Sequence, residues 1–264
     1  MKLINPKKSL GQNFLTDNNI INIIVDQGNI NENDIILEVG PGTGSLTEKI
    51  LSKNPKKIFA IEKDKYLSKN LNKKFNEKLI IINEDILKID ENKLSNQPMI
   101  VFGNLPYNIS TQILVKWIKL FDLNKTFKKL ILMFQKEVAE RIIATTNKKN
   151  YGRLAVLSSW RLNIKKIIDV SPNSFYPVPK VKSTVLLIEP KKEYFALRNP
   201  KNLEHITKIF FNQRRKMIKK PINILFKKYK FDYKKFNIDP TDRPQNIDIS
   251  KYLKIVNEYE SSGI

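Results

Sequence analysis

The feature that most constrains the fold is an alternation, from residue 35 onward, between apolar runs of strand length and longer segments with helical spacing. Seven runs have the length and composition of strands, at 35–39, 57–61, 79–83, 99–103, 129–134, 153–160 and 183–189. The intervening segments carry apolar residues three and four positions apart, so each can cover a sheet with one stripe. The alternation therefore predicts an α/β domain with one open, parallel, seven-stranded sheet and crossover helices.

The pattern changes near residue 190, where prolines and charges interrupt it and the later apolar segments have only helical spacing. This predicts a first domain over residues 1–190, with an N-terminal arm over residues 1–15, and a small all-α domain over residues 191–264. Residues 191–264 hold 18 Lys and Arg against 8 Asp and Glu, so +10 of the whole chain's formal charge of +22 lies in about a quarter of its length. Because drift toward lysine would spread evenly, this excess favours a polyanionic partner, with nucleic acid first and anionic membrane second.

Composition also narrows the classes of site and compartment. The chain has no cysteine, so neither disulfides nor thiolate metal sites are expected. The only histidine, His205, has no second histidine to share a metal, so no metal site is predicted. No apolar run is long enough for a signal peptide or a membrane span, and we expect a cytoplasmic protein.

A glycine-rich segment, EVGPGTG, follows the first predicted strand and holds Gly40, Gly42 and Gly44, three of only eight glycines. Glycine lets the backbone turn sharply and approach a ligand, and the next helix directs its amide donors there. The G-x-G-x-G spacing is neither the dinucleotide fingerprint nor a P-loop. Glu62 and Asp85 end the next two strands, where they can bind a ribose and an adenine, although strand-end acids are also common helix caps. Together these features predict a ligand that contains adenosine and needs no phosphate.

The motifs EVGPGTG, IEKD, EDIL and NLPY occur in that order, together with KKSLGQNFL at 7–15, SPNSFYPVPKVKSTV at 171–185 and FNQRRK at 211–216. With this set, which spans nearly the whole chain, the sequence resembles the class I S-adenosylmethionine-dependent methyltransferases. Within that class it resembles the ribosomal RNA adenine N6,N6-dimethyltransferases. The resemblance implies a Rossmann-like seven-stranded methyltransferase sheet with helices on both faces, and S-adenosyl-L-methionine as methyl donor.

The resemblance also implies the cofactor contacts, residue by residue. Asn13 and Leu15 would border the methionine end, the backbone at Gly40 and Gly42 would contact the cofactor, Glu62 would hold the ribose, Asp85 the adenine ring, and Asn104 the edge where cofactor and substrate meet.

The turn N-L-P-Y suits methylation of the exocyclic amine of adenine, a poor nucleophile because its lone pair is delocalised into the ring. The side-chain carbonyl of Asn104 and the main-chain carbonyl of Leu105 would accept from the amine and free that lone pair for in-line attack. Pro106 fixes the turn and donates no hydrogen bond. Tyr107 offers a flat face to a base withdrawn from its stack, and the resemblance places Phe175 on the other side. Either ring could instead be an ordinary core or turn aromatic.

Basic residues predict the RNA contacts. Arg214, Arg215, Lys216, Lys219 and Lys220 fall within little more than two helical turns with few acids nearby, which suits phosphate binding. A solvated basic face remains the alternative, and Arg214 could instead anchor a domain interface. Lys7 and Lys8 are expected to add contacts beside the active site. The segment FYPVPKV and the residue after it differ from the family's FxPPPKVDS at Val178 and Lys182. These differences bear on the stiffness of the loop and on RNA contact rather than on the chemistry.

The resemblance implies dimethylation at N6 of two adjacent adenosines in the 3'-terminal hairpin loop of small-subunit (16S) rRNA, during ribosome biogenesis. The expected partner is that RNA within a small-subunit precursor particle, and the enzyme is expected to be monomeric. Two alternatives stay open: a 23S rRNA adenine N6-methyltransferase of the macrolide-resistance type, and a non-catalytic RNA-binding assembly factor on the same fold. The motifs GPGTGSLT and FNQRRK favour the small-subunit dimethyltransferase over the macrolide-resistance type. Asn104, Tyr107 and the cofactor acids argue against a pure binder.

Overall fold

The computed structural model describes residues 6–120, 122–227 and 230–263, except for the side chain of Lys8. Its contacts divide the chain into two compact units. The first comprises the residues up to Ala139 together with Asn163–Pro190, and the second comprises Glu140–Leu162 together with the residues from Lys191 onward. The longer part of the second unit thus begins where the sequence places its boundary, but this unit also includes residues 140–162, which the sequence pattern assigns to the first domain.

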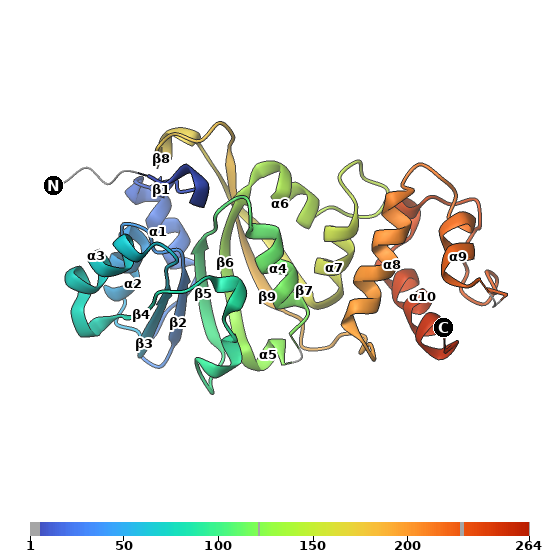
Figure 1. Cartoon of the computed structure of the whole chain (residues 1–264), viewed down its shortest axis with the longest axis horizontal. Coiled ribbons are helices and arrows are strands. Elements are labelled where there is room, and N and C mark those ends of the chain that lie inside the picture. Colours follow the sequence, from blue (N-terminus) through green and yellow to red (C-terminus); the bar gives the residue numbers. More distant parts are fainter. Residues whose placement is uncertain (1–5, 121, 228–229, 264) are drawn as a thin grey trace. The chain divides into compact units, whose positions relative to one another are not determined.

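A seven-stranded sheet forms the centre of the first unit (Figure 1). In spatial order its strands are β4 (Ile80–Ile82), β3 (Lys57–Ile61), β2 (Ile35–Val39), β5 (Met99–Asn104), β6 (Phe127–Gln135), β9 (Ser183–Pro190) and β7 (Leu162–Val170). The predicted α/β sheet of seven strands is therefore confirmed. It is mixed rather than wholly parallel, because β9 runs antiparallel to β6 while β2 to β6 are parallel. Strand direction depends on the connections, which an apolar pattern does not reveal.

The sixth strand is the main departure from the prediction. The segment 153–160 forms a helix, α7 (Arg153–Arg161), and the strand β7 follows it. Most apolar side chains of α7 are buried, and a short helix buried on several sides has the same apolar run as a buried strand. β7 lies at the edge of the sheet, where the exposed Lys165 and Lys166 interrupt its apolar alternation.

Helices cover both faces of the sheet. On one face, α1 (Asn18–Asp26), α2 (Ser45–Leu51) and α3 (Lys65–Phe75) share a hydrophobic cluster with alternate residues of β2, β3 and β5. On the other lies α4 (Ser110–Ile118), whose Trp117 ring meets Phe127 edge to face at 5.2 Å between centroids. The remaining helical elements of this region are α5 (Leu123–Thr126), α6 (Lys136–Ile142) and the 3-10 turns Lys8–Leu10, Asn76–Lys78, Ile86–Lys88, Glu91–Lys93 and Pro172–Ser174.

The register of the sheet brings the candidate site residues to one edge. Val39 is level with Ile61 of β3 and with Gly103 of β5. The glycine loop after β2, Glu62 after β3 and the turn that starts at Asn104 therefore begin side by side, at the carboxyl ends of parallel strands.

A separate two-stranded sheet joins the N-terminal arm to the loop before β9. β1 (Phe14–Leu15) pairs antiparallel with β8 (Phe175–Tyr176), so that Leu15 lies opposite Phe175. The backbone amide of Thr16 also donates to the carbonyl of Ser174 at 2.9 Å. The arm is thus held against a part of the chain about 160 residues later.

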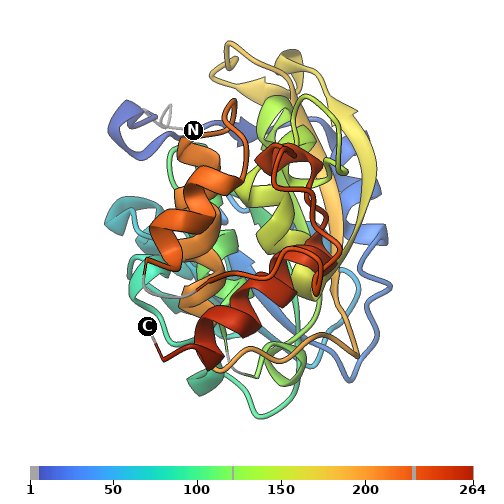
Figure 2. The ribbon, with the colours of Figure 1, turned by 90° about the vertical axis from the view of Figure 1, so that its right-hand side faces the viewer.

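The second unit is built mainly from helices. α8 (Pro200–Asn212), α9 (Lys219–Leu225) and α10 (Ile249–Ser261) follow one another along the chain, with a 3-10 turn at Pro244–Asn246 (Figure 2). The ring of Tyr252 is fully buried and meets Phe210 at 5.4 Å between centroids. This aromatic contact joins α8 to α10, and α7 packs against both helices.

Candidate active site

A cavity opens at the carboxyl edge of the sheet, within the first unit. The space it encloses, together with the open solvent at its mouth, is about 1080 Å³. Its walls come from the arm, the glycine loop, the ends of β3 and β4 and the turn after β5; they comprise Ser9–Leu15, Val39–Thr43, Ser45, Leu46, Ile61–Lys63, Leu67, Glu84–Ile86 and Asn104–Ile109. The cavity therefore unites the arm with the predicted ends of four strands.

The glycine loop needs glycine for two physical reasons. Gly40, Gly42 and Gly44 all have positive φ, at 69°, 59° and 84°. A Cβ on Gly42 would lie 2.9 Å from Cδ1 of Phe14, a distance that real Cβ atoms essentially never show. A Cβ on Gly44 would lie 2.7 Å from the ring of Phe75, so this glycine lets α2 approach α3. The loop thus leaves backbone, rather than side chains, to line the cavity.

Glu62 is buried beneath that loop. Its carboxylate accepts the backbone amides of Gly42 at 3.1 Å and Asp64 at 2.8 Å, one on each oxygen. Burial raises the pKa of Glu62, and these hydrogen bonds oppose the rise. A carboxylate has further lone pairs, so Glu62 retains capacity to accept the hydroxyls of a ribose.

A second buried acid, Glu38, was not among the predicted site residues. It lies in β2 immediately before the glycine loop, is 1% exposed and accepts the hydroxyl of Thr47 at 2.7 Å. Burial raises the pKa of Glu38 to about 7, against the lowering effect of Thr47, and the nearby charge of Glu62 adds to the rise. The signal in the sequence was an acid inside the apolar run IILEV, where a charged residue is unexpected.

Asp85 lies at the cavity wall as expected. It caps the 3-10 turn Ile86–Lys88, since its Oδ1 accepts the amide of Leu87 at 3.0 Å. Its Oδ2 accepts the ammonium of Lys63 at 2.8 Å, and this hydrogen bond lowers the pKa of Asp85 despite partial burial. The residue is therefore both a turn cap and an ionised acid at the mouth of the cavity.

The turn after β5 directs Asn104 into the site. The Asn104 amide nitrogen donates to the backbone carbonyl of Asn13 at 2.8 Å, which leaves the side-chain oxygen as an acceptor. The side chain of Leu105 is buried, and a Cβ on Gly103 would approach it to 2.7 Å. The carbonyl of Pro106 accepts the amide of Ser110 at 3.0 Å and so joins the turn to the first residue of α4.

Tyr107 is half-buried and its ring is held at its hydroxyl end. The hydroxyl lies 2.6 Å from Oγ of Ser183, the first residue of β9. Burial raises the pKa of Tyr107, opposed by this hydrogen bond. Ser183 lies 76 residues further along the chain and was not predicted, because nothing in the sequence links a serine at a strand start to a distant tyrosine.

The two predicted aromatic residues are placed differently. Tyr107 lines the cavity, whereas Phe175 is 2% exposed, belongs to the hydrophobic cluster beside Leu15 and is absent from the cavity wall. The exposed neighbours of Phe175 are Tyr176, 52% exposed, and Val178, 61% exposed. The stacking role of Phe175 therefore stays a prediction that this arrangement does not display.

The arm is fastened over the site through Asp64. This carboxylate, 3% exposed, lies 3.0 Å from the ammonium of Lys7 and accepts the side-chain amide of Gln12 at 3.1 Å. Burial would raise the pKa of Asp64, but the hydrogen bonds from Lys7, Gln12 and the Tyr66 amide, with the charge of Lys7, together lower it. Lys7, expected to contact RNA, is thus engaged with an acid of its own chain, and the side chain of Lys8 lies outside the described residues.

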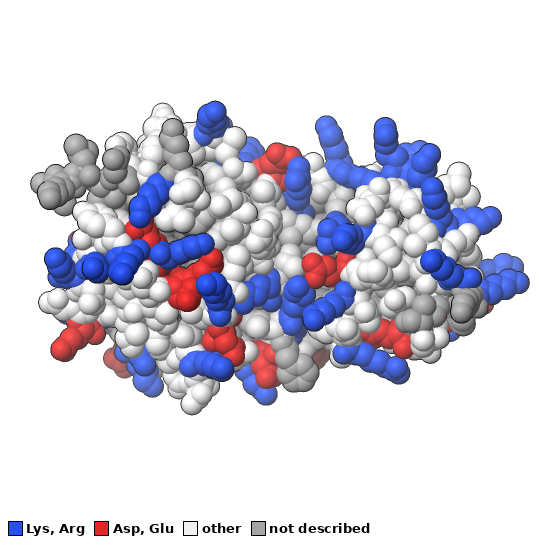
Figure 3. Space-filling view, viewed as in Figure 1, with Lys and Arg blue, Asp and Glu red and all other residues white. Residues whose placement is uncertain are grey.

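The predicted basic cluster spans the turn between α8 and α9 and the first residues of α9. The expected helix is interrupted there, since α8 ends at Asn212 and α9 starts at Lys219. Arg215, Lys216, Lys219 and Lys220 are exposed, while Arg214 donates to the Lys149 carbonyl and to Oε1 of Gln245. On the face shown in Figure 3, basic side chains crowd the C-terminal helices, with few acids among them. Arg214 therefore has a structural partner within its own unit.

The sequence predicts neither a metal site nor a membrane span. Among the described residues, no group of three or more His, Cys, Asp or Glu side chains is placed to hold a metal, and the ring of His205 packs near Tyr259. Within the same part of the chain, no helix has the length and apolar character that a membrane crossing requires.

Comparison with known proteins finds likeness over nearly the whole chain. A model of the family described as ribosomal RNA adenine dimethylase matches residues 4–261. The ribosomal RNA small subunit methyltransferase A of Pelagibacter ubique is 54% identical, over 97% of this chain and 98% of that protein. The protein of the same name from Ehrlichia chaffeensis is 41% identical, over 96% and 97%.

Solved structures give the same result for the fold. A dimethyladenosine transferase from Plasmodium falciparum matches with a TM-score of 0.81 at 27% identity, over 95% of this chain and 98% of that one. The 23S rRNA methyltransferase ErmE matches with a TM-score of 0.68 at 22% identity, over 94% and 99%, which is a likeness in fold alone.

Proposed function

Since this chain belongs to the ribosomal RNA adenine dimethylase family, we propose that it dimethylates N6 of two adjacent adenosines in the 3'-terminal hairpin loop of small-subunit (16S) rRNA. The chain is an S-adenosyl-L-methionine-dependent rRNA adenine methyltransferase. The observation that supports methylation at adenine N6 is the side-chain oxygen of Asn104, left as an acceptor at the cavity wall by the hydrogen bond to Asn13. The choice of small-subunit rRNA is supported by relatives named ribosomal RNA small subunit methyltransferase A.

The residues of the cavity fit the cofactor. When bound, S-adenosyl-L-methionine supplies a methyl group on a sulfonium centre. Gly40 and Gly42 leave room for a ligand against the backbone, and the buried Glu62 has acceptor capacity for two ribose hydroxyls. Asp85, at the neighbouring strand end, would accept the amino group of the adenine ring, while Asn13 and Leu15 would border the methionine end from the arm.

Asn104 and Leu105 orient the amine of the target adenine. Two carbonyl acceptors, the Asn104 side chain and the Leu105 backbone, draw the amine hydrogens out of the plane of the base, which returns the lone pair to nitrogen. Because both acceptors are held by the fold before substrate arrives, they stabilise the positive charge that develops on nitrogen at little reorganisation cost. Pro106 has no amide hydrogen that could compete for them.

Tyr107 receives the base that leaves the RNA stack. Its hydroxyl is fixed by Ser183, so the ring presents a face whose orientation is set before binding. Phe175 would close the other side only if its ring left the cluster beside Leu15. Replacing Phe175 with Leu keeps an apolar side chain there, so a large loss of turnover with unchanged thermal stability would support stacking.

The RNA partner is proposed to be the small-subunit precursor particle, bound by a cytoplasmic monomer through Arg215, Lys216 and Lys219. These side chains are exposed and lie in the part of the chain richest in basic residues. Arg215→Glu should weaken RNA binding and reduce its dependence on salt, because phosphate contacts release counterions. Lys56→Glu, an equal charge change at an exposed position before β3, is the matched control.

One labelling experiment tests the reaction and its site. Labelled S-adenosyl-L-methionine is offered with unmodified small-subunit particles, with naked 16S rRNA or with 23S rRNA, and the label is mapped. We expect label at N6 of two adjacent adenosines in the 3'-terminal hairpin loop, with particles preferred. Label in 23S rRNA alone would support the macrolide-resistance type instead, and no label in any RNA would support a non-catalytic assembly factor.

A further inference from the structure

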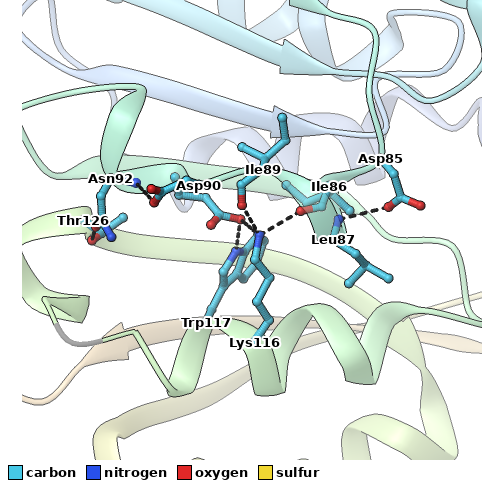
Figure 4. Close-up of polar contacts among 10 residues, drawn as sticks. Asp85, Ile86, Leu87, Ile89, Asp90, Asn92, Lys116, Trp117 and Thr126 are labelled. Atoms are coloured by element: carbon cyan, nitrogen blue, oxygen red, sulfur yellow. Dashed lines mark hydrogen bonds and ion pairs between the residues drawn. The ribbon is translucent and has the colours of Figure 1, made fainter.

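A buried ion pair next to the cofactor cavity has no part in the chemistry proposed above. Glu91, in the 3-10 turn Glu91–Lys93, is 0% exposed. Its Oε1 accepts the ammonium of Lys116 at 2.7 Å and the indole N–H of Trp117 at 2.7 Å, both from α4 (Figure 4). A carboxylate taken fully out of water needs such partners, because its desolvation is otherwise unfavourable.

The ammonium of Lys116 also binds the backbone of the loop that precedes Glu91. It donates to the carbonyl oxygen of Ile86 at 2.8 Å and to that of Ile89 at 2.5 Å. Lysine has three N–H donors, and here each has an acceptor. All three acceptors lie in the single segment 86–91, so one side chain holds that segment at three points.

This segment continues from the proposed adenine contact. Asp85 and Ile86 both line the cavity, and Asp85 caps the turn whose first carbonyl Lys116 binds. We propose that Lys116 is a positioning residue for the adenine end of the cofactor site: it fixes residues 86–91 from α4 and thereby holds Asp85 and Ile86 at the cavity wall. The inference rests on the proposed role of Asp85 toward the adenine ring.

The helix that carries Lys116, α4, is itself attached to the turn after β5 that holds Asn104 and Leu105. The amides of Ile109 and Ser110 donate to the carbonyl of Pro106 at 3.1 and 3.0 Å, so α4 starts directly on that turn. Lys116 lies about two turns further along, roughly 9 Å by helical rise. The helix α4 therefore starts at the turn that orients the substrate and carries, near its end, the lysine that holds residues 86–91.

Removing Lys116 alone would leave the Glu91 charge buried without its counterion and could unfold the protein. The test variant is therefore the double substitution Lys116→Met/Glu91→Gln, which removes both charges and keeps an amide oxygen for Trp117. The matched control is Lys128→Met/Asp34→Asn. That pair is also 2.7 Å apart with a buried carboxylate, but it lies before β2 and in β6, at the other end of the strands.

Binding of S-adenosylhomocysteine and of adenosine is measured by calorimetry, with melting temperature and steady-state kinetics on small-subunit particles. We expect the Lys116 double variant to bind both ligands about tenfold more weakly, the loss expected for one or two misplaced hydrogen bonds. The KM for S-adenosyl-L-methionine should rise by a similar factor, while kcat at saturation changes by less than about twofold. The control variant should bind both ligands like the unaltered protein, although its melting temperature also falls.

Two results would overturn the positioning role: unaltered ligand affinity in the Lys116 double variant, or an equal loss of affinity in both double variants. Asp85→Ala, titrated in parallel, separates this inference from the proposed adenine contact. If Asp85→Ala binds like the unaltered protein, the adenine contact is wrong. If Asp85→Ala is weakened and the Lys116 double variant is not, only the positioning role falls.

Discussion

In the cofactor half of the cavity the contacts join neighbouring strands, whereas in the substrate half they join segments far apart in the chain. The Glu62 carboxylate accepts the backbone amide of Gly42, 20 residues earlier in the chain. Asn104 reaches Asn13 across 91 residues, and Tyr107 reaches Ser183 across 76. The comparison teaches that the glycine loop and Glu62 are held by contacts between adjacent strands, while Asn104 and Tyr107 depend on the arm and on β9. The two functions should therefore be separable by substitution.

The largest expected effect is in the substrate half. Asn104→Ala should lower kcat by about 10²- to 10³-fold, as removal of one preorganised group at a reacting centre does. The affinity for S-adenosylhomocysteine should fall by less than about tenfold, because the glycine loop and Glu62 are untouched and only the single hydrogen bond to Asn13 beside the methionine end is lost. Single-turnover methyl transfer and calorimetry measure the two quantities. Near-normal methyl transfer in this variant would remove Asn104 from its orienting role.

The next effect sharpens the comparison through pH. Because the pKa of buried Glu38 is raised to about 7 from 4.5, the folded state holds a proton there that the unfolded state has lost, so this group lowers stability as pH rises between these values. Glu38→Gln should remove that dependence. The free energy of unfolding of the variant, relative to that of the unaltered protein, should therefore rise by about 3 kcal/mol from pH 5 to pH 8. Urea unfolding at the two pH values measures it. A constant difference between the two proteins would contradict a raised pKa.

A smaller effect is expected from the glycine loop. Gly42→Ala places a Cβ 2.9 Å from the Phe14 ring at a φ of 59°, and the left-handed backbone costs about 1–2 kcal/mol. Affinity for S-adenosylhomocysteine should fall by about tenfold. Gly152→Ala is the control, because a Cβ there meets nothing within 4 Å and its φ is −168°. Equal affinities in the two variants would show that the loop tolerates a side chain.

The smallest effect concerns the long-range contact of the tyrosine. Tyr107→Phe keeps the ring and removes only the hydrogen bond to Ser183, worth about 1 kcal/mol. Turnover should fall by a few fold through a looser ring, with cofactor affinity unchanged, and Ser183→Ala should give the same loss without adding to it in the double variant. Additive losses in this double-mutant cycle would mean that the two side chains act independently.

Much of this architecture could be predicted from the sequence because it is local. The glycine loop and the acids at the ends of β3 and β4 follow directly from strand position, and the register then places Asn104 beside them. Strand β7 was missed because Lys165 and Lys166 interrupt the alternation of apolar and polar residues. Helix α7 was predicted as a strand because a short buried helix and a buried strand have the same apolar pattern. Ser183 and Asp64 were missed for a different reason: their partners lie far along the chain, and no spacing rule reports them.

The pairing of β1 with β8 also has a consequence for the order in which the enzyme becomes functional during its own synthesis. A nascent chain that has released β2 to β5 already contains the glycine loop, the strand-end acids and the Asn104 turn, but the partner of its arm is about 70 residues short of being made. The arm can already contact Asp64 and Asn104 by then, so it is the β1–β8 pairing that forms late in translation, when about two thirds of the protein exists.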